Sequence, residues 1–198
     1  MSRGSSVSDY ARFFANFARH PFSIGAIAPS SRHLAKVMVS EMGISEADTV
    51  VELGPGTGAF TGTIESELGP ETLCFALEID PKFASALQDR FPRIEVLNDS
   101  AENIANHLST RDREHADAIV CGIPWASLPA DFQERAMSAV LDSLRPGGKF
   151  CTFAYIHSAW FPTARRIRHW LGDRFSHVET TPVVWRNCPP ALVYRCTR

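Results

Sequence analysis

An apolar run that leads directly into a glycine-rich turn is the feature that most constrains how this chain folds. Residues 50–53 read Val-Val-Glu-Leu, and residues 54–59 read Gly-Pro-Gly-Thr-Gly-Ala. This order is typical of a buried strand that ends in a tight turn and opens a helix. Glycines let the backbone approach a bound molecule, and the first N–H groups of the helix can hold an anionic part of it. The segment therefore predicts a ligand site at the end of a strand.

Apolar and amphipathic segments alternate along the rest of the chain. The predicted strands are 48–53, 72–79, 93–97, 116–121 and 148–156, with helices at 57–68, 82–90, 101–107 and 131–144 between them. A helix near 162–171 and extended runs at 177–186 and 191–197 follow, and helices at 8–19 and 31–42 precede the first strand, the second of them capped by Ser30 or Ser31. This alternation predicts an α/β, Rossmann-like fold with a seven-stranded, mostly parallel sheet, an antiparallel edge strand, helices on both faces and two extra N-terminal helices.

Composition sets broad limits on the protein. Its 198 residues, 44% of them hydrophobic, suit one domain, and a net charge of -2 gives no overall attraction to nucleic acid or anionic membranes. The five cysteines are scattered without metal-ligand spacing, so we expect no metal site and a reducing, cytoplasmic compartment. The N-terminus lacks the pattern of a secretory signal, and no apolar run approaches the roughly 20 residues that span a bilayer. We therefore expect a soluble or peripheral protein.

Acidic residues stand at the ends of the next two predicted strands. Glu78, followed by Ile79, ends the second strand, and a carboxylate there can accept both hydroxyls of a ribose. Asp99, followed by Ser100, comes after the third strand, where it can accept a hydrogen bond from the exocyclic amine of adenine. Together with the glycine turn, these residues predict an adenosine-containing ligand.

The glycine turn by itself fits two such ligands. Gly54, Gly56 and Ala59 satisfy the dinucleotide pattern G-x-G-x-x-G/A as well as a turn for S-adenosylmethionine. Three features favour the methyl donor: Glu52 two residues before the first glycine, the acidic residue after the third strand, and the lack of a second mononucleotide-binding half within 198 residues.

On these motifs the chain resembles the class I S-adenosylmethionine-dependent methyltransferases, in the branch that includes the rRNA adenine dimethylases and the bacterial phospholipid N-methyltransferases. The resemblance covers nearly the whole chain and implies S-adenosylmethionine as cofactor and S-adenosylhomocysteine as product. It implies a cofactor site formed by Glu52, Gly54, Gly56 and Gly58 around the methionine part, Glu78 with Ile79 at the ribose, and Asp99 with Ser100 at the adenine.

The segment after the fourth predicted strand bears on the methyl acceptor. Base-directed amino methyltransferases carry Asn or Asp there, then x-Pro-aromatic, whereas residues 121–125 read Cys-Gly-Ile-Pro-Trp. Gly122 takes the place of the amide that orients a nucleobase amine, so we expect no nucleic-acid substrate. Residues 25–31 and 184–191 resemble the phospholipid N-methyltransferases, which implies methylation of phosphatidylethanolamine and its methylated intermediates towards phosphatidylcholine.

The N-terminal segment suggests contact with a membrane. Residues 8–19 place Tyr10, Phe13, Phe14 and Phe17 on one helix face, which either packs on the domain or lies on an anionic bilayer. We interpret 1–45 as a helical lid and possible membrane-contact segment and 46–198 as the methyltransferase domain. Residues 160–170, which include Trp170 and three arginines, are a second candidate contact. Peripheral association with the inner face of the cell membrane is expected.

Methyl transfer to an amine needs few chemical groups, because the enzyme mainly holds an uncharged amine opposite the sulfur. Aromatic faces suit a methylated ammonium, and one group can accept a proton. The catalytic candidates are Tyr155, Trp125, Tyr10 and His157. Ser30, Arg186 and Asn187 are candidates to hold a lipid phosphate, although capping and turn formation would explain them as well.

Three other functions compete with lipid methylation. An RNA adenine N6-methyltransferase of the rRNA dimethylase type conflicts with Gly122, and the chain has no dense Lys/Arg cluster for a nucleic-acid partner. A lipid-binding module with a nonproductive cofactor fold conflicts with the intact set of acidic residues and glycines. A small-molecule methyltransferase is compatible with every core motif.

Overall fold

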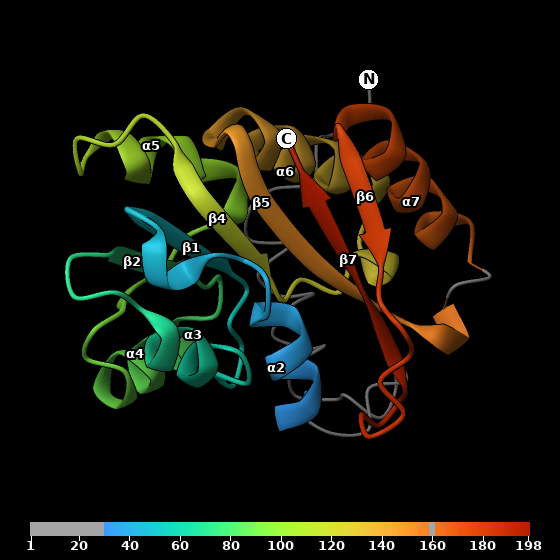
Figure 1. Ribbon diagram of the computed structural model, residues 1–198, viewed down its shortest axis with the longest axis horizontal. Helices are drawn as coiled ribbons and strands as arrows, with labels where there is room; N and C mark the ends of the chain where they lie inside the picture. Colours follow the sequence, from blue (N-terminus) through green and yellow to red (C-terminus); the bar gives the residue numbers. More distant parts are fainter. Residues whose placement is uncertain (1–29, 159–160) are drawn as a thin grey trace.

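The computed structural model describes residues 30–158 and 161–198, which form one seven-stranded sheet between two layers of helices (Figure 1). The strands are β1 Thr49–Leu53, β2 Leu73–Leu77, β3 Glu95–Leu97, β4 Ala116–Cys121, β5 Leu144–Tyr155, β6 His177–Thr180 and β7 Ala191–Thr197. The α-helices are α2 Arg32–Val39, α3 Thr61–Glu67, α4 Pro81–Arg90, α5 Ile104–Ser109, α6 Ala130–Ser143 and α7 Pro162–Arg174.

The order of strands is β3-β2-β1-β4-β5-β7-β6, with the first five parallel. β7 runs antiparallel to β5 and to the edge strand β6, so the predicted mixed sheet with an antiparallel edge pairing is confirmed. The chain reverses its direction of growth between β1 and β4, which both lie at the centre of the sheet. In open α/β sheets, ligands bind outside the carboxyl ends of the strands at such a point.

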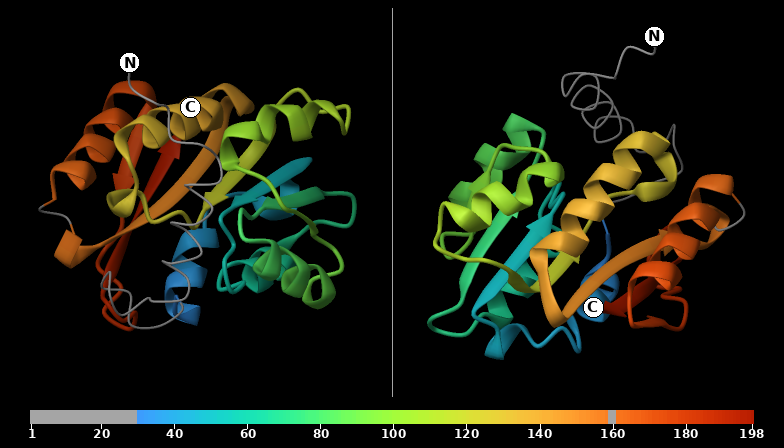
Figure 2. Two further views of the ribbon diagram at one scale, coloured as in Figure 1. Left: turned by 180° about the vertical axis from the view of Figure 1, so that it is seen from behind. Right: turned by 90° about the horizontal axis from the view of Figure 1, so that it is seen from above.

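Each face of the sheet has its own apolar core, because successive side chains of a strand point to opposite faces. Val51 and Leu53 of β1 pack with α5, α6 and α7, whereas Val50 packs with α2 and α3. Figure 1 shows these two groups of helices on opposite faces, and the view from above in Figure 2 shows α5, α6 and α7 side by side. α2 belongs to the second core through the buried side chains of Leu34 and Met38.

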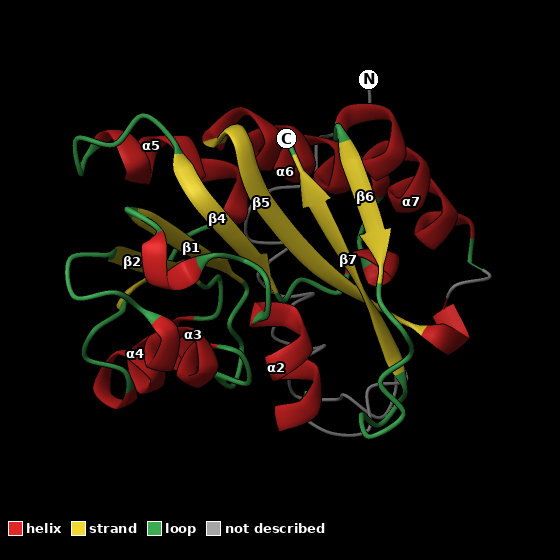
Figure 3. Cartoon of the chain, in the orientation of Figure 1, coloured by secondary structure: helices red, strands yellow, loops and turns green. Residues whose placement is uncertain are grey.

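Some boundaries differ from the predicted ones (Figure 3). α3 starts at Thr61 instead of residue 57, because the glycine turn extends the irregular segment. α6 ends at Ser143, close to the predicted end at 144, but β5 begins at Leu144 and not at residue 148, with a register shift against β4 between Ala116 and Ala118. The run 177–186 is a strand only to Thr180, since Pro182 has no N–H to donate to a ladder.

The structure describes only part of the N-terminal segment that precedes β1. Ser31 caps α2 as expected, and its Oγ accepts the N–H of Leu34 at 3.2 Å. The predicted helix at 8–19, with Tyr10 and its aromatic stripe, lies outside the described residues. Within residues 30–158 and 161–198, no helix is long and apolar enough to cross a membrane.

Candidate active site

The turn after β1 is closed on its inner side and open at its tip. Gly54, Gly56 and Gly58 have φ values of 66°, 57° and 83°, which favour glycine. A Cβ on Gly54 would lie 2.9 Å from Ile123 Cγ1, and one on Gly58 would lie 2.6 Å from Leu87 Cδ2. A Cβ on Gly56 would meet no atom within 4 Å. The turn is therefore packed against its own domain on two sides and exposes its backbone at Gly56.

Glu78 links this turn to the end of β2. Its Oε2 accepts the N–H of Gly56 at 2.8 Å, and its Oε1 accepts the N–H of Asp80 at 2.9 Å. Burial raises the pKa of Glu78, while these backbone hydrogen bonds oppose the rise. Each carboxylate oxygen keeps a further lone pair, so Glu78 can hold the turn and still accept hydroxyl groups.

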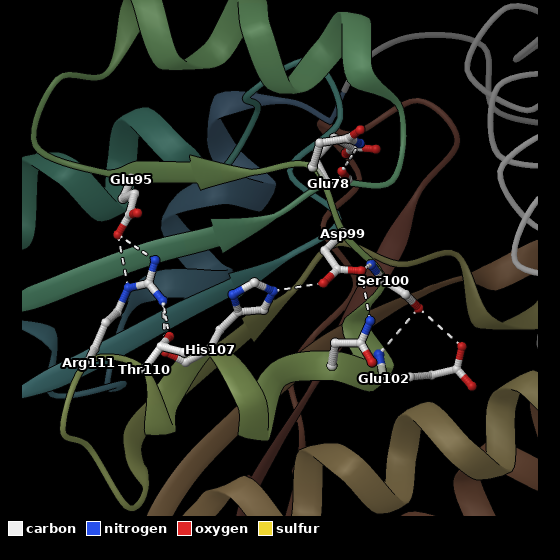
Figure 4. Close-up of polar contacts among 10 residues, drawn as sticks. Glu78, Glu95, Asp99, Ser100, Glu102, His107, Thr110 and Arg111 are labelled. Carbon is white, nitrogen blue, oxygen red and sulfur yellow. Dashed lines mark hydrogen bonds and ion pairs between the residues drawn. The ribbon is translucent and has the colours of Figure 1, made fainter.

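Asp99 lies just after the end of β3, and Figure 4 shows it below Glu78. Its Oδ1 accepts the N–H of Ser100 at 2.7 Å, and its Oδ2 lies 2.8 Å from His107 Nε2. Burial alone would raise the pKa of Asp99, but the hydrogen bonds to His107, Asn103 and Ser100 outweigh it and hold the pKa below its usual value. The carboxylate is therefore ionised at neutral pH.

These residues line one pocket, which we call the glycine-turn pocket, with an empty volume of about 280 Å³. Its lining contains the predicted residues Gly54, Glu78, Ile79, Asp99 and Ser100, together with Leu77, Ala101, Ile123 and Phe132. Carboxylates on two sides and apolar walls between them suit the ribose hydroxyls and the flat adenine ring of an adenosine derivative. The sequence did not single out Ile123 and Phe132, because apolar residues there read as ordinary core.

Glu52 lies directly beneath the turn and is fully buried. Neither of its carboxylate oxygens has a hydrogen-bond partner within residues 30–158 and 161–198. Burial raises the pKa of Glu52 to about 8, a nearby Thr61 hydroxyl opposes the rise, and the negative charge of Glu78 adds to it. An unpaired buried carboxyl group is costly, and a cationic ligand group would compensate it. The predicted contact of Glu52 with the methionine part of the cofactor fits this arrangement and stays a prediction.

A second pocket, which we call the aromatic pocket, lies between β5, β7 and α7, with an empty volume of about 660 Å³. Trp125, Tyr155 and His157, three of the predicted catalytic residues, line it. Phe161 and Tyr194 also line it. The sequence offered Phe161 only as part of the candidate membrane contact at 160–170, and it did not suggest Tyr194, because the elements that carry these residues come together only on folding. Since Ile123 lines the glycine-turn pocket and Pro124-Trp125 line the aromatic pocket, one loop separates the two.

The aromatic residues of the second pocket are held by specific contacts. The indole Nε1 of Trp125 donates to Thr152 Oγ1 at 2.9 Å. The rings of Tyr155 and His157 stack with centroids 5.6 Å apart and an interplanar angle of 15°. Burial raises the pKa of Tyr155, so its phenol stays protonated at neutral pH. His157 is exposed to solvent.

The loop between the two pockets begins at Gly122, and the packing around this residue leaves no room for a side chain. A Cβ there would lie 2.6 Å from the carbonyl oxygen of Gly54 and 3.4 Å from Phe60 Cε2. The loop after β4 therefore packs directly on the glycine turn. The backbone of Gly54 fills the space that the Asn or Asp side chain of a base-directed methyltransferase would need at this position.

The predicted phosphate-binding residues come together near the start of α2. Asn187 is buried, and its Oδ1 accepts the N–H of Ser31 at 2.8 Å, while Ser30 directly precedes this contact. Arg186 is exposed, and its Nη1 lies 3.0 Å from Nε2 of His33, a partner that the sequence did not suggest. The contacts of Asn187 are structural, so Arg186 is the side chain of this set that is free to meet an anion.

The structure corrects one residue of the second candidate membrane contact, at 160–170, and leaves the contact itself a prediction. Trp170 is buried and packs edge-on against Phe175 with centroids 6.1 Å apart, so it belongs to the core and is no interfacial residue. Arg165, Arg166 and Arg168 are exposed on α7, and Phe161 before the helix is 51% exposed.

Comparison with known proteins agrees with this geometry. A family model described as "Methyltransferase domain" matches residues 50–148. The chain is 33% identical over 193 residues, 96% of each chain, to the ornithine lipid N-methyltransferase of Singulisphaera acidiphila. It belongs to the class I S-adenosylmethionine-dependent methyltransferases. S-adenosylmethionine is accordingly its cofactor, and the residues of the glycine-turn pocket fit the adenosine part of that molecule.

Two further likenesses are weaker. The ribosomal RNA small subunit methyltransferase A of Maridesulfovibrio salexigens is 36% identical over 74 residues, which span 37% of this chain and 28% of that protein. The crystal structure of the N-methyltransferase NodS from Bradyrhizobium japonicum with S-adenosylhomocysteine superposes with a TM-score of 0.65 at 17% identity, over 84% of this chain and 86% of that one. This second likeness concerns the fold.

Among the described residues, no cluster of His, Cys, Asp and Glu could hold a metal ion.

Proposed function

We propose that this methyltransferase transfers methyl groups to the amine of a membrane lipid, namely phosphatidylethanolamine and its methylated intermediates towards phosphatidylcholine. The observation that carries the proposal is the aromatic pocket, which adjoins the glycine-turn pocket across the loop of residues 123–125. When bound, S-adenosylmethionine would supply an electrophilic methyl carbon, to which an uncharged amine can bond in line while the sulfur leaves as the thioether of S-adenosylhomocysteine. The acceptor amine therefore has to lie between the two pockets.

The aromatic pocket suits such an acceptor in both of its charge states. Trp125, a core residue that is only 3% exposed, and Tyr155 both line the pocket, where their rings can attract a methylated ammonium by cation–π interaction. The phenol oxygen of neutral Tyr155 can accept a hydrogen bond from the incoming amine and so orient its lone pair. The exposed imidazole of His157, stacked on Tyr155, is the proposed route by which the ammonium proton reaches water.

An anionic headgroup has a partner in Arg186. This exposed guanidinium lies next to His33 at the N-terminus of α2, and a guanidinium with helix N–H groups suits a phosphate. Ser30 is the other proposed contact with the substrate, and Asn187 would support the site indirectly by holding Ser31 in place.

Ornithine lipid is a second candidate acceptor. The relative that aligns over 96% of both chains is named an ornithine lipid N-methyltransferase, which favours this lipid for our chain as well. Both lipids carry an amine on an anionic headgroup, so the same two pockets serve either one. RNA is disfavoured, since the contact between Gly122 and Gly54 leaves no room for the amide of a base-directed enzyme.

We further propose that the protein is cytoplasmic and works at the inner face of the cell membrane. Residues 1–45 would act as the lid and membrane-contact segment of the methyltransferase domain at 46–198, with the helix at 8–19 on the anionic surface. Support comes from the two exposed large apolar side chains of the described residues, Phe161 and Trp185, which are 51% and 72% exposed. Both lie beside residues proposed to hold the acceptor.

Methyl transfer from labelled S-adenosylmethionine to defined vesicles tests the function. The purified protein is given vesicles of phosphatidylcholine alone or mixed with phosphatidylethanolamine or with ornithine lipid, and rRNA and a soluble amine are offered in parallel. Label in phosphatidylethanolamine supports the first acceptor, and label only in ornithine lipid replaces it by the second. Label in rRNA, or in neither lipid while a soluble amine is methylated, overturns lipid methylation.

A matched pair of variants ties the result to the aromatic pocket. Trp125→Leu removes a π face, and its lipid methylation should fall at least tenfold with little change in cofactor affinity. Trp185→Leu changes an exposed tryptophan outside the pocket lining and should keep the rate on detergent-dispersed lipid. Equal rates for the two variants would contradict the assignment of the acceptor site.

A further inference from the structure

The carboxylate of Asp99 is held by more donors than its neighbours in the glycine-turn pocket. The Nδ2 of Asn103 donates to its Oδ1 at 2.7 Å, in addition to the N–H of Ser100 on the same oxygen. The Nε2 of His107 lies 2.8 Å from its Oδ2. Figure 4 shows His107 on the side of Asp99 that faces away from Glu78. These hydrogen bonds fix the orientation of the Asp99 carboxylate.

The side chains of Asn103 and His107 lie on the same face at the start of α5. Asn103 precedes the first residue of this helix, and His107 stands four positions later, so one helical turn brings both to the same face. The chain thus presents an amide and an imidazole at the spacing that brackets a single carboxylate.

His107 is in turn held in place. Its ring packs against Phe75 of β2 with centroids 6.3 Å apart, and its carbonyl oxygen accepts from Arg111 Nη1 at 2.8 Å. Arg111 lies over the same Phe75 ring and forms an ion pair with Glu95 of β3 at 2.7 Å. The imidazole is therefore anchored to two strands of the sheet and is well placed to fix another group.

We propose that His107 and Asn103 are positioning residues that aim the Asp99 carboxylate at the 6-amino group of adenine and so make the site selective for 6-amino over 6-oxo purines. The inference rests on the proposed adenine contact of Asp99. Oδ1 already accepts from Asn103 and Ser100, so the lone pair of Oδ2 that His107 leaves unoccupied remains for a donor in the pocket. A 6-oxo purine presents a carbonyl oxygen there, which repels a carboxylate that cannot turn away.

Competition between two cofactor products tests the proposal. Affinities of S-adenosylhomocysteine and S-inosylhomocysteine, which differ in the 6-amino and 6-oxo groups, are measured by calorimetry. We expect the native protein to prefer the adenine compound by at least about tenfold, as for one hydrogen bond to a charged group. His107→Ala and Asn103→Ala should each lose most of this preference, His107→Gln should keep it because its amide can still donate, and Ser109→Ala, on the exposed side of α5, should leave it unchanged.

The outcomes separate this inference from the assignment on which it rests. If Asp99→Ala keeps the full preference for adenine, Asp99 does not contact the amino group and the underlying role is wrong. If Asp99→Ala loses the preference but His107→Ala and Asn103→Ala retain it, only the positioning role is overturned. A parallel loss of both affinities in His107→Ala would assign the imidazole to general stability, and Asn103→Ala gives an independent reading if His107→Ala fails to fold.

Discussion

The side chain of Asn187 accepts a hydrogen bond from the backbone N–H of Ser31 at 2.8 Å, across 156 positions of sequence. Its amide nitrogen donates to the carbonyl oxygen of Pro189 at 2.6 Å, and the side chain is buried. One amide thus fastens the N-terminus of α2 to the turn between β6 and β7. Arg186, the proposed anion contact, is the residue next to it.

Replacing this amide should destabilise the protein. Asn187→Ala leaves the N–H of Ser31 and the carbonyl of Pro189 without their partner, so the free energy of unfolding should fall by about 1–3 kcal/mol. Urea denaturation followed by circular dichroism measures the change. Ser31→Ala, which removes only the helix cap, is the control and should cost about 1 kcal/mol. Identical midpoints for Asn187→Ala and the native protein would refute the structural role.

Local patterns were sufficient to predict that the glycine turn, Glu78 and Asp99 lie close together, and their roles toward the cofactor stay predictions. Each of them lies within two residues of the end of a strand. Because the carboxyl ends of parallel strands meet at one edge of a sheet, these residues become neighbours in space. His107 was missed although it is close in sequence, because a histidine on a short helix has no distinctive spacing. His33, and the place of Phe161 in the aromatic pocket, were missed because their partners lie far along the chain.

Other differences arise where packing overrides propensity. Trp170 reads as an interfacial aromatic beside arginines, yet α7 turns it into the core against Phe175. Gly147 and Gly148 are residues that usually end a helix, and in the structure they form part of strand β5. The N–H of Gly147 donates to the carbonyl oxygen of Arg198 at 2.9 Å, which holds this part of the strand. These pairings depend on the C-terminal strand, which no local pattern could align with residues 147–148.

Gly122 should tolerate no side chain. Gly122→Ala would bring a Cβ within 2.6 Å of the Gly54 carbonyl oxygen, so the glycine turn must shift and affinity for S-adenosylhomocysteine should fall at least tenfold in calorimetry. Gly172→Ala is the matched control, because a Cβ there meets no atom within 4 Å and helix α7 should gain about 0.5–1 kcal/mol. Native affinity in Gly122→Ala would show that the loop after β4 can yield.

Membrane association should depend on the exposed aromatic side chains. The double variant Phe161→Ser/Trp185→Ser removes the two large apolar groups that the described residues expose, so its partition onto anionic vesicles should fall several-fold in cosedimentation. Glu114→Ser, an exposed change in the loop before β4, should bind as the native protein does. Undiminished binding of the double variant would assign membrane contact to other residues.

The buried carboxyl of Glu52 should make the ligand-free protein less stable as the pH rises. Its pKa is about 8 in the folded protein and near the ordinary value of 4.5 when unfolded, so its contribution is fully present below 4.5 and is lost as the pH rises to about 8. The expected loss is about 1.4 kcal/mol for each pH unit within this window. Glu52→Gln stays neutral throughout, so urea denaturation at pH 5 and pH 8.5 should show this variant gaining stability over the native protein at the higher pH. Parallel pH profiles would mean that Glu52 is ionised in the native fold.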